Sequence, residues 1–325
     1  MKKLSIGKIR GLQQLANEKD IMAMCALDHR DSLKRMLDEE HPVNVSYQAL
    51  VDFKLDLSRS LSPYASAILL DPVYGAGQAI AAGVLSKGTG LLVSLEKSGY
   101  SGEPEARITD LLPEWNVRKI KKMGATGVKL LLYYRSDSNA AKRQLDTVKR
   151  LADDCLAEDI PFVVEPVSYK MGKAEAEPQN FARIKPQLVI ETARQITALP
   201  IDILKTEFPA DIKYEKDEVR LLDFCHQLNE ASQTPWVILS AGVNFELFHH
   251  EVKLACQAGA SGFLAGRALW QEATQINSRQ ERLAFLETIV AKRLKSLTEL
   301  ANAYGTPWYA KLEATEVDEN WHRSY

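Results

Sequence analysis

The sequence predicts a (β/α)₈ barrel, for three reasons. Short apolar runs alternate with amphipathic segments along the 325 residues, which is typical of parallel strands joined by helices. Eight such runs can be counted, matching a barrel that needs roughly 250 residues or more. No glycine-rich dinucleotide fingerprint follows the first run, which argues against a doubly wound sheet. We expect a single domain over 1–325, with the barrel in about 20–303 and a C-terminal tail in 304–325.

The predicted strands are almost continuously hydrophobic, as expected for strands that are covered on both faces. They are Ile21–Leu27, Ala67–Asp71, Leu91–Glu96, Gly127–Tyr133, Pro161–Val167, Ile201–Phe208, Trp236–Ser240 and Gly262–Ala265.

Two of the helices between or after these strands are especially clear. Ser46–Leu61 places its leucines and Phe53 on one stripe. Ser278 and Glu281 form a capping-box signature at the start of a second helix. This helix is expected to end before Gly305 and Pro307. Its predicted inward-facing positions are Leu283, Leu286, Ile289, Val290, Leu294 and Leu297.

Two irregular segments also carry expectations. Ser168–Gln179 follows the fifth predicted strand and contains Gly172, so we expect a mobile loop over the active-site end of the barrel. The tail contains Trp308 and Trp321 and is too aromatic for a typical disordered end. We expect it to pack on the barrel or on a neighbouring subunit.

Composition excludes several classes of partner. A formal net charge of −2 gives no electrostatic case for binding nucleic acid or an anionic membrane. The N-terminus lacks the apolar core of a signal peptide, and no apolar span is long enough for a transmembrane helix. The four cysteines have no CxxC spacing, which favours reduced thiols. We therefore expect a cytoplasmic protein. We also expect it to form a homo-oligomer.

Lys205 is the leading candidate for catalysis. It lies near the end of an apolar run, where desolvation of an amine is costly unless the protein uses it. Lys129 and Glu165 occupy comparable positions in two other runs. A single strand lysine more often snorkels or forms an ion pair. Two amines and a carboxylate at the ends of different strands, however, are the groups that imine (Schiff-base) chemistry on a sugar carbonyl requires.

The alternation of side chains along a barrel strand indicates how these groups work together. Lys205 shares a face with Ile203 and Glu207, and an inward lysine near the carboxyl end faces the mouth of the barrel. Burial and the nearby charge of Lys129 would leave Lys205 a neutral, nucleophilic amine. Glu165 would then transfer protons during imine formation and hydrolysis.

Two further acids and an arginine lie at strand ends. Asp71 precedes a proline, but Leu-Asp-Pro is also a common strand-exit turn, and both interpretations stay open. Asp28 is a candidate for hydrogen bonding a substrate hydroxyl, and Arg30 for holding an anion. The alternative for this pair is a helix-capping aspartate and a surface arginine.

The last two strands predict an anion site. Ser240 and Gly242 follow the seventh strand, and Gly266 and Arg267 follow the eighth. The loops after strands seven and eight are the usual phosphate site of a (β/α)₈ barrel. Glycines at strand exits are often only turns, but glycines at both of these exits favour phosphate binding.

The sequence gives no support for a metal or another cofactor, and we expect none. His249 and His250 are adjacent and would point apart on a helix, and the other histidines show no ligand spacing.

With these residues identified, the chain resembles the class I tagatose 1,6-diphosphate aldolases along nearly its whole length. The resemblance is carried by the motifs at residues 27–36, 62–75, 96–100, 128–134, 239–243 and 266–270 and by the strands of Glu165 and Lys205.

The resemblance implies that Lys205 forms the Schiff base and Glu165 is the acid/base, with Lys129 and Asp28 as supporting catalytic residues. It also implies reversible, metal-independent cleavage of a phosphorylated ketose, D-tagatose 1,6-bisphosphate, to glycerone phosphate and D-glyceraldehyde 3-phosphate. One departure is His29, where the family usually has glutamine.

Three alternatives remain beside this interpretation. The segments 235–243 and 257–267 resemble sulfofructosephosphate aldolase at least as well, and the substrate of that enzyme carries a sulfonate in place of the distal phosphate. Residues 71–75, 96–100 and 306–308 favour the tagatose enzyme. A metabolite-sensing barrel without catalysis would have no need of the Lys129, Glu165 and Lys205 set. A deoxyribose-phosphate type aldolase has a shorter chain and a different lysine spacing.

Overall fold

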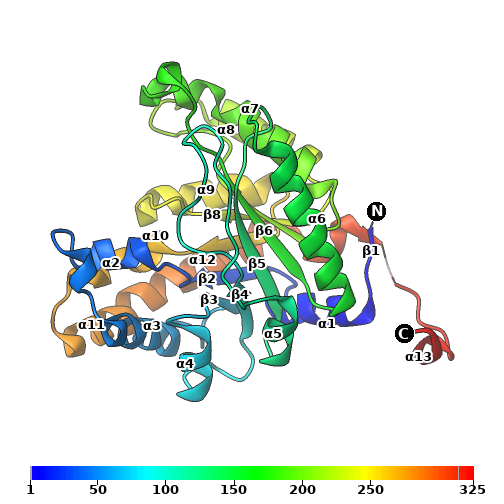
Figure 1. Cartoon of the computed structure of the whole chain (residues 1–325), viewed down its shortest axis with the longest axis horizontal. Coiled ribbons are helices and arrows are strands. Elements are labelled where there is room, and N and C mark those ends of the chain that lie inside the picture. Colours follow the sequence, from blue (N-terminus) through cyan, green and yellow to red (C-terminus); the bar gives the residue numbers. More distant parts are fainter. Residues whose placement is uncertain (1, 314) are drawn as a thin grey trace.

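The computed structural model describes residues 2–313 and 315–325. Within these residues, eight parallel strands close into a barrel in the order β2-β3-β4-β5-β6-β7-β8-β9 (Figure 1). The predicted (β/α)₈ barrel is therefore confirmed, with strand ends shifted by no more than two residues. The strands are β2 (Met22–Ala26), β3 (Ala67–Leu70), β4 (Gly90–Ser94), β5 (Gly127–Tyr133), β6 (Phe162–Val167), β7 (Ile203–Thr206), β8 (Trp236–Leu239) and β9 (Gly262–Ala265).

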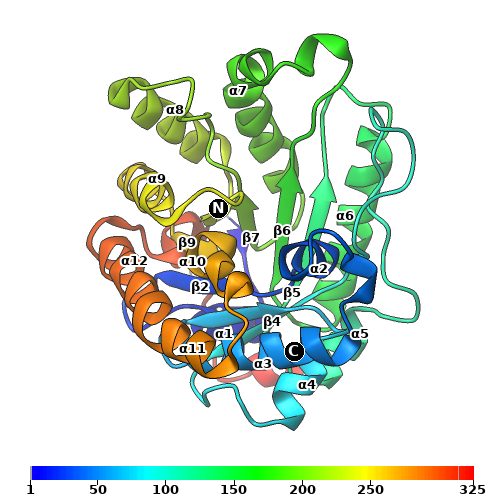
Figure 2. The same ribbon diagram turned by 90° about the vertical axis from the view of Figure 1, so that its left-hand side faces the viewer.

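Helices form a ring around the strands, and α2 and α10 lie in front of the barrel in Figure 2. The main helices are α1 (Ile6–Leu15), α2 (Asp31–Leu37), α3 (Tyr47–Leu61), α4 (Ala76–Ala81), α5 (Val117–Lys122), α6 (Ala141–Ala157), α7 (Pro178–Thr197), α8 (Glu218–Ala231), α9 (Phe245–Gln257), α10 (Arg267–Trp270), α11 (Arg279–Phe285), α12 (Ala291–Tyr304) and α13 (Trp321–Ser324). None of the helices within 2–313 and 315–325 has the length and apolar character needed to cross a bilayer.

The interior of the barrel is packed and apolar below its mouth. Alternate residues of each strand point inward, and those in the lower layers are almost completely buried. Because side chains fill this space, a ligand that enters the barrel lies above them, at the carboxyl ends of the strands. The inward-facing residues include Met22, Met24, Ala67, Leu69, Leu92, Val163, Ile203, Val237 and Leu264.

The opposite end of the barrel is covered by the N-terminal helix and by the tail. Leu12 and Leu15 of α1 pack into the same cluster as Trp308 and Leu312. Trp308 is 5% exposed, and its indole N–H donates to Asp20 Oδ1 over 3.3 Å. The short strands β1 (Lys2–Lys3) and β10 (Leu312–Glu313) pair in parallel. The predicted packing of the tail on the barrel is confirmed for this part of the tail.

Both predicted helices form, with one error of register. Ser46 caps α3 by accepting a hydrogen bond from Ala49 N, and Ser278 caps α11 by accepting one from Glu281 N. A π-helical turn over Leu286–Val290 then joins α11 to α12. A π turn contains more residues than an α turn and rotates the faces of the helix. Ile289, predicted to face inward, is consequently 45% exposed.

The loop predicted over the active site is held by side chains. It contains one short 3₁₀ turn, Lys173–Glu175, and ends where α7 begins at Pro178. The buried Arg135 donates to the carbonyl of Tyr169 over 3.0 Å and pairs with Glu175. Gly172 N donates to Glu105 over 2.8 Å. These contacts fix the conformation described here, and the mobility of the loop stays a prediction.

Glu251 on α9 is a buried acid of the helical layer, away from the barrel mouth. It is 5% exposed, and burial raises its pKa from 4.5 to about 8. Lys185 opposes this shift and Asp211 adds to it. Between these two pH values the folded protein holds a proton that the unfolded chain releases, so stability must fall as the pH rises.

We predict that Glu251→Gln removes this pH dependence. The variant should match the wild type near pH 5 and exceed it near pH 8.5 by on the order of a few kcal/mol. Urea unfolding at the two pH values measures the difference. An advantage of equal size at both values would show that Glu251 is not protonated in the folded state.

Candidate active site

Charged side chains form the interior layer directly above the apolar layers of the barrel. Residues two apart on a strand point the same way. The inward series of β2 therefore continues beyond Met24 to Asp28, and that of β7 continues from Ile203 to Lys205. The residues of this charged layer are Asp28, Glu96, Lys129, Glu165 and Lys205.

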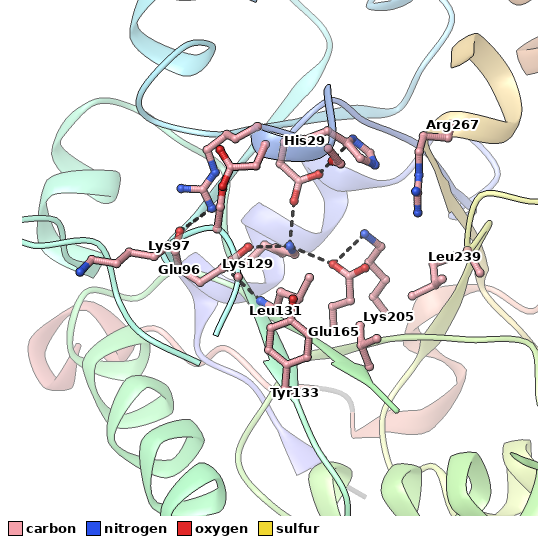
Figure 3. Close-up of a pocket in the computed structure, with 18 of the residues that line it drawn as sticks. His29, Glu96, Lys97, Lys129, Leu131, Tyr133, Glu165, Lys205, Leu239 and Arg267 are labelled. Carbon is pink, nitrogen blue, oxygen red and sulfur yellow. Dashed lines mark hydrogen bonds and ion pairs between the residues drawn. The ribbon is translucent and has the colours of Figure 1, made fainter. Parts of the chain in front are cut away.

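Lys129 is at the centre of the layer, surrounded by three carboxylates (Figure 3). Its Nζ atom lies 2.7 Å from Asp28 Oδ2, 2.8 Å from Glu96 Oε1 and 2.9 Å from Glu165 Oε2. Lys205 Nζ lies 2.9 Å from the same Glu165 Oε2. The structure thus brings together four residues predicted from the sequence, with one carboxylate oxygen between the two amines.

The electrostatics of the layer keep Lys129 charged and Asp28 and Glu165 ionised. Burial would lower the pKa of Lys129, but Asp28, Glu165 and Glu96 together hold that pKa well above its usual value. Burial would raise the pKa of Glu165, yet the ammonium groups of Lys129 and Lys205 lower it overall. The pKa of Asp28 is lowered against burial by the same two lysines. Glu165 is therefore available to accept a proton before it donates one.

A cavity of about 480 Å³ opens above these residues. Arg267 lines it at one side and Lys97 at the other, with Lys129, Glu165 and Lys205 between them (Figure 3). Arg30 lies on the side of Lys97, because its Nη2 donates to the Glu96 carbonyl over 2.6 Å. Among the described residues, no carboxylate lies within ion-pair distance of Arg30, Lys97 or Arg267. The cavity therefore presents unpaired positive charge at both ends of a reactive centre.

The predicted phosphate residues gather around Arg267. Gly242 has φ +81°, and a Cβ atom there would lie 3.1 Å from the Arg267 guanidinium carbon. A Cβ atom on Gly266 would lie 2.9 Å from the ring of His29. The backbone carbonyl of Ser240 closes this turn by accepting a hydrogen bond from Val243 N over 2.9 Å. The turn residue that lines the cavity is Ala241, which carries a strained φ of +45°. Phosphate binding here stays a prediction.

His29 presents a neutral imidazole to the cavity. Its ring lies edge-on to Trp270 with centroids 5.2 Å apart. Burial, with the charges of Arg267, Lys54 and Lys205, lowers the pKa of His29 to about 3 even though Asp28 is adjacent. Its Nδ1 atom has no hydrogen-bond partner within the described chain. A ring N–H or a ring lone pair can therefore take the place of the amide that glutamine would supply.

Asp71 belongs to a structural pair rather than to the cavity. Lys54, 1% exposed, forms an ion pair with Asp71 and donates to the carbonyl of Leu27 over 2.7 Å. The other carboxylate oxygen of Asp71 accepts from Val73 N and Tyr74 N at 2.9 and 2.8 Å. The strand-exit interpretation of Asp71 is thus supported. The pair also fixes the carbonyl immediately before Asp28.

Two acids of the cavity were missed from the sequence, as was Lys97. Glu96, the last residue of a predicted strand, contacts Lys129. Glu207 lines the cavity, and its Oε2 accepts hydrogen bonds from the N–H and hydroxyl of Ser168 at 2.9 and 2.7 Å. The signal for both was the one used for Glu165, an acid at the inward end of a strand. In the part of the chain described, no three His, Cys, Asp or Glu side chains are grouped to hold a metal ion.

A closed parallel barrel whose mouth holds paired lysines and carboxylates has the architecture of an aldolase. Residues 22–272, more than half of the chain, match the family described as DeoC/LacD family aldolase. The chain belongs to the DeoC/LacD family of aldolases, and it is a lyase.

Curated relatives match over almost the full length. The tagatose 1,6-diphosphate aldolase 1 of Enterococcus faecalis is 34% identical over 332 residues, covering 96% of this chain and 100% of that protein. A tagatose 1,6-diphosphate aldolase of Listeria monocytogenes is 33% identical over 337 residues, with coverage of 97% and 98%.

Solved structures support the fold. The fructose-bisphosphate aldolase of Plasmodium falciparum superposes with a TM-score of 0.68 at 15% identity, covering 94% of this chain and 98% of that one. An archaeal fructose 1,6-bisphosphate aldolase gives a TM-score of 0.59 at 18% identity, covering 90% and 98%. At these identities the likeness concerns the fold alone.

We predict that Lys54→Met destabilises the protein by about 3–5 kcal/mol, because it leaves the buried Asp71 without a counter-charge. Adding Asp71→Asn should recover part of that loss, because the asparagine side chain is neutral and needs no counter-charge. Urea unfolding of the two single variants and the double variant gives the coupling. Equal and additive losses would contradict a direct interaction.

Proposed function

We propose that the protein is a class I aldolase in which Lys205 forms a Schiff base with a phosphorylated ketose. The observation that carries this proposal is the buried contact of 2.9 Å between Lys205 Nζ and Glu165 Oε2, at the edge of a cavity. An amine becomes a nucleophile when a base is within hydrogen-bond reach and water is excluded. Both conditions are present at Lys205, which is 3% exposed.

The first half of the proposed reaction builds an iminium ion. Lys205 first gives a proton to Glu165, and the neutral amine attacks the C2 carbonyl. Glu165 passes this proton to the oxygen at C2 and then takes a second proton from the nitrogen of the new carbon–nitrogen bond. Glu165 delivers the second proton to the C2 hydroxyl, which leaves as water. Each such transfer by a positioned group is worth roughly 10²–10⁴-fold in rate. Lys129 stays charged throughout and polarises the oxygen at C2.

The second half breaks the carbon–carbon bond. The iminium ion withdraws the electron pair of the C3–C4 bond while a carboxylate, Glu165 or Asp28, removes the proton of the C4 hydroxyl. An aldehyde leaves and an enamine remains on Lys205. Protonation of the enamine at C3 and hydrolysis of the imine release the ketone product and restore the free amine.

We propose a substrate with an anion at each end, and D-tagatose 1,6-bisphosphate in particular. Arg267 would hold one phosphate near Lys205, while Arg30 and Lys97 would hold the other. Binding both ends places the carbonyl beside the amine, which supplies much of the rate by orientation. The names of the Enterococcus and Listeria relatives support this choice. The products would be glycerone phosphate and D-glyceraldehyde 3-phosphate.

We predict that borohydride traps substrate on Lys205. Reduction of the imine in the presence of tagatose 1,6-bisphosphate should add the mass of the reduced adduct to the peptide containing Lys205. Lys205→Met should show no adduct and no turnover, while its unfolding curve stays close to that of the wild type. An active wild-type enzyme without an adduct would rule out the imine mechanism.

We predict a preference for two phosphates. The kcat/KM should be highest for tagatose 1,6-bisphosphate or its epimer fructose 1,6-bisphosphate, and lower for sulfofructose 1-phosphate. The reason is that a phosphate dianion interacts more strongly than a sulfonate with Arg30 and Lys97. Coupled assays of glycerone phosphate release measure all three. Preferred cleavage of the sulfonate would instead identify the enzyme as a sulfofructosephosphate aldolase.

A further inference from the structure

Glu96 is held from three directions at the mouth of the barrel. Its Oε1 lies 2.8 Å from Lys129 Nζ, and its Oε2 accepts a hydrogen bond from Leu131 N over 3.0 Å. Its own carbonyl accepts one from Arg30 over 2.6 Å, and its backbone bridges to Leu111. The residue is 3% exposed. Both carboxylate oxygens are therefore engaged by the protein itself.

The other two carboxylates around Lys129 are less constrained. Glu165 uses Oε2 for both lysines, and no hydrogen bond to its Oε1 is found among the described residues. Asp28 uses Oδ2 for Lys129, and its Oδ1 lies 4.0 Å from His29, beyond hydrogen-bond distance. Each of these two acids keeps an oxygen for a reacting group, whereas Glu96 does not.

This difference assigns different tasks to the three acids. In the proposed reaction Glu165 loses its negative charge each time it carries a proton. At those stages Lys129 would have only Asp28 as a counter-charge if Glu96 were neutral. Glu96 adds a negative charge that does not alternate, and this charge also favours the iminium ion on Lys205 over its neutral precursor.

We infer that Glu96 is a positioning residue, the fixed counter-charge that keeps Lys129 protonated and in place while Glu165 exchanges protons with Lys205. This inference rests on the proposed function and deepens it. The groups that face Lys129 are Asp28 beyond β2, Glu96 beyond β4, Tyr133 on β5, Glu165 on β6 and Lys205 on β7.

The test is Glu96→Gln, which keeps the shape of the side chain and removes its charge. The kcat for tagatose 1,6-bisphosphate should fall roughly 10- to 100-fold, somewhat less than for loss of a group that touches the substrate. The KM should change little, because Arg30 contacts the carbonyl of residue 96 and not its side chain. The alkaline limb of the kcat–pH profile should move down by about 1–3 pH units, as Lys129 loses a neighbouring negative charge.

A conservative variant separates charge from structure. Glu96→Asp keeps the charge but places it further from Lys129. Compared with Glu96→Gln, it should recover part of the kcat and return the alkaline limb toward its wild-type position. If Glu96→Gln yields too little folded protein, the Glu96→Asp profile decides alone: a limb moved partway to lower pH supports the inference, and an unmoved limb overturns it.

The matched control is Asp110→Asn in the same β4–α5 segment. The backbone carbonyl of Asp110 accepts a hydrogen bond from Lys97 N over 2.8 Å, and the substitution leaves this contact in place. Its kcat should stay within about twofold of the wild type, with the alkaline limb in place. An equal shift in this control would mean that only the overall field of the loop matters, and would overturn a specific role for Glu96.

Borohydride trapping distinguishes failure of the inference from failure of the proposed function. If Glu96→Gln keeps the wild-type kcat and alkaline limb while the wild type forms its adduct on Lys205, only the inference is wrong. An active wild type that forms no adduct contradicts the proposed function itself.

Discussion

The contact of one carboxylate oxygen with two lysine amines determines the arrangement of the whole site. Because Lys129 and Lys205 each lie 2.9 Å from Glu165 Oε2, their nitrogens can be no further apart than twice that distance. Two ammonium groups so close would repel each other strongly in a buried site. The carboxylate between them makes the arrangement possible and gives both amines access to one proton carrier.

The barrel provides this geometry at little structural cost. Its apolar interior is filled below the mouth, so the charged layer lies on a rigid base and cannot shift downward into the barrel. Lys129, Glu165 and Lys205 lie on three different strands, and Asp28 and Glu96 follow two others within two residues. Each of these strands is held by its neighbours on both sides. Positions fixed in this way are more accurate than positions on loops, which is what short contacts between like-charged groups require.

Most of the fold and much of the site could be predicted from the sequence. Strand periodicity located the strands to within two residues, and an amine at an inward strand end pointed to Lys129 and Lys205. The partners of these amines were harder to predict. Lys129 contacts Glu96 and Asp28, which lie 33 and 101 residues away in the sequence. Asp71 has the same local sequence signature as Glu165, but its ion pair with Lys54 from α3 and its hydrogen bonds to the turn that follows give it a structural role. Similarly, nothing in the heptad-like spacing around Ile289 indicates a π turn.

The pairing of β1 with β10 has a practical consequence. It places Lys2–Lys3 beside Leu312–Glu313, on the side of the barrel that α1 and Trp308 cover. In Figure 1 both termini lie away from α2 and α10. A tether or fused protein attached at either end would therefore leave the cavity facing solution. The chain is suited to immobilisation on a solid support or to linkage with an enzyme that consumes its products, in either order of fusion.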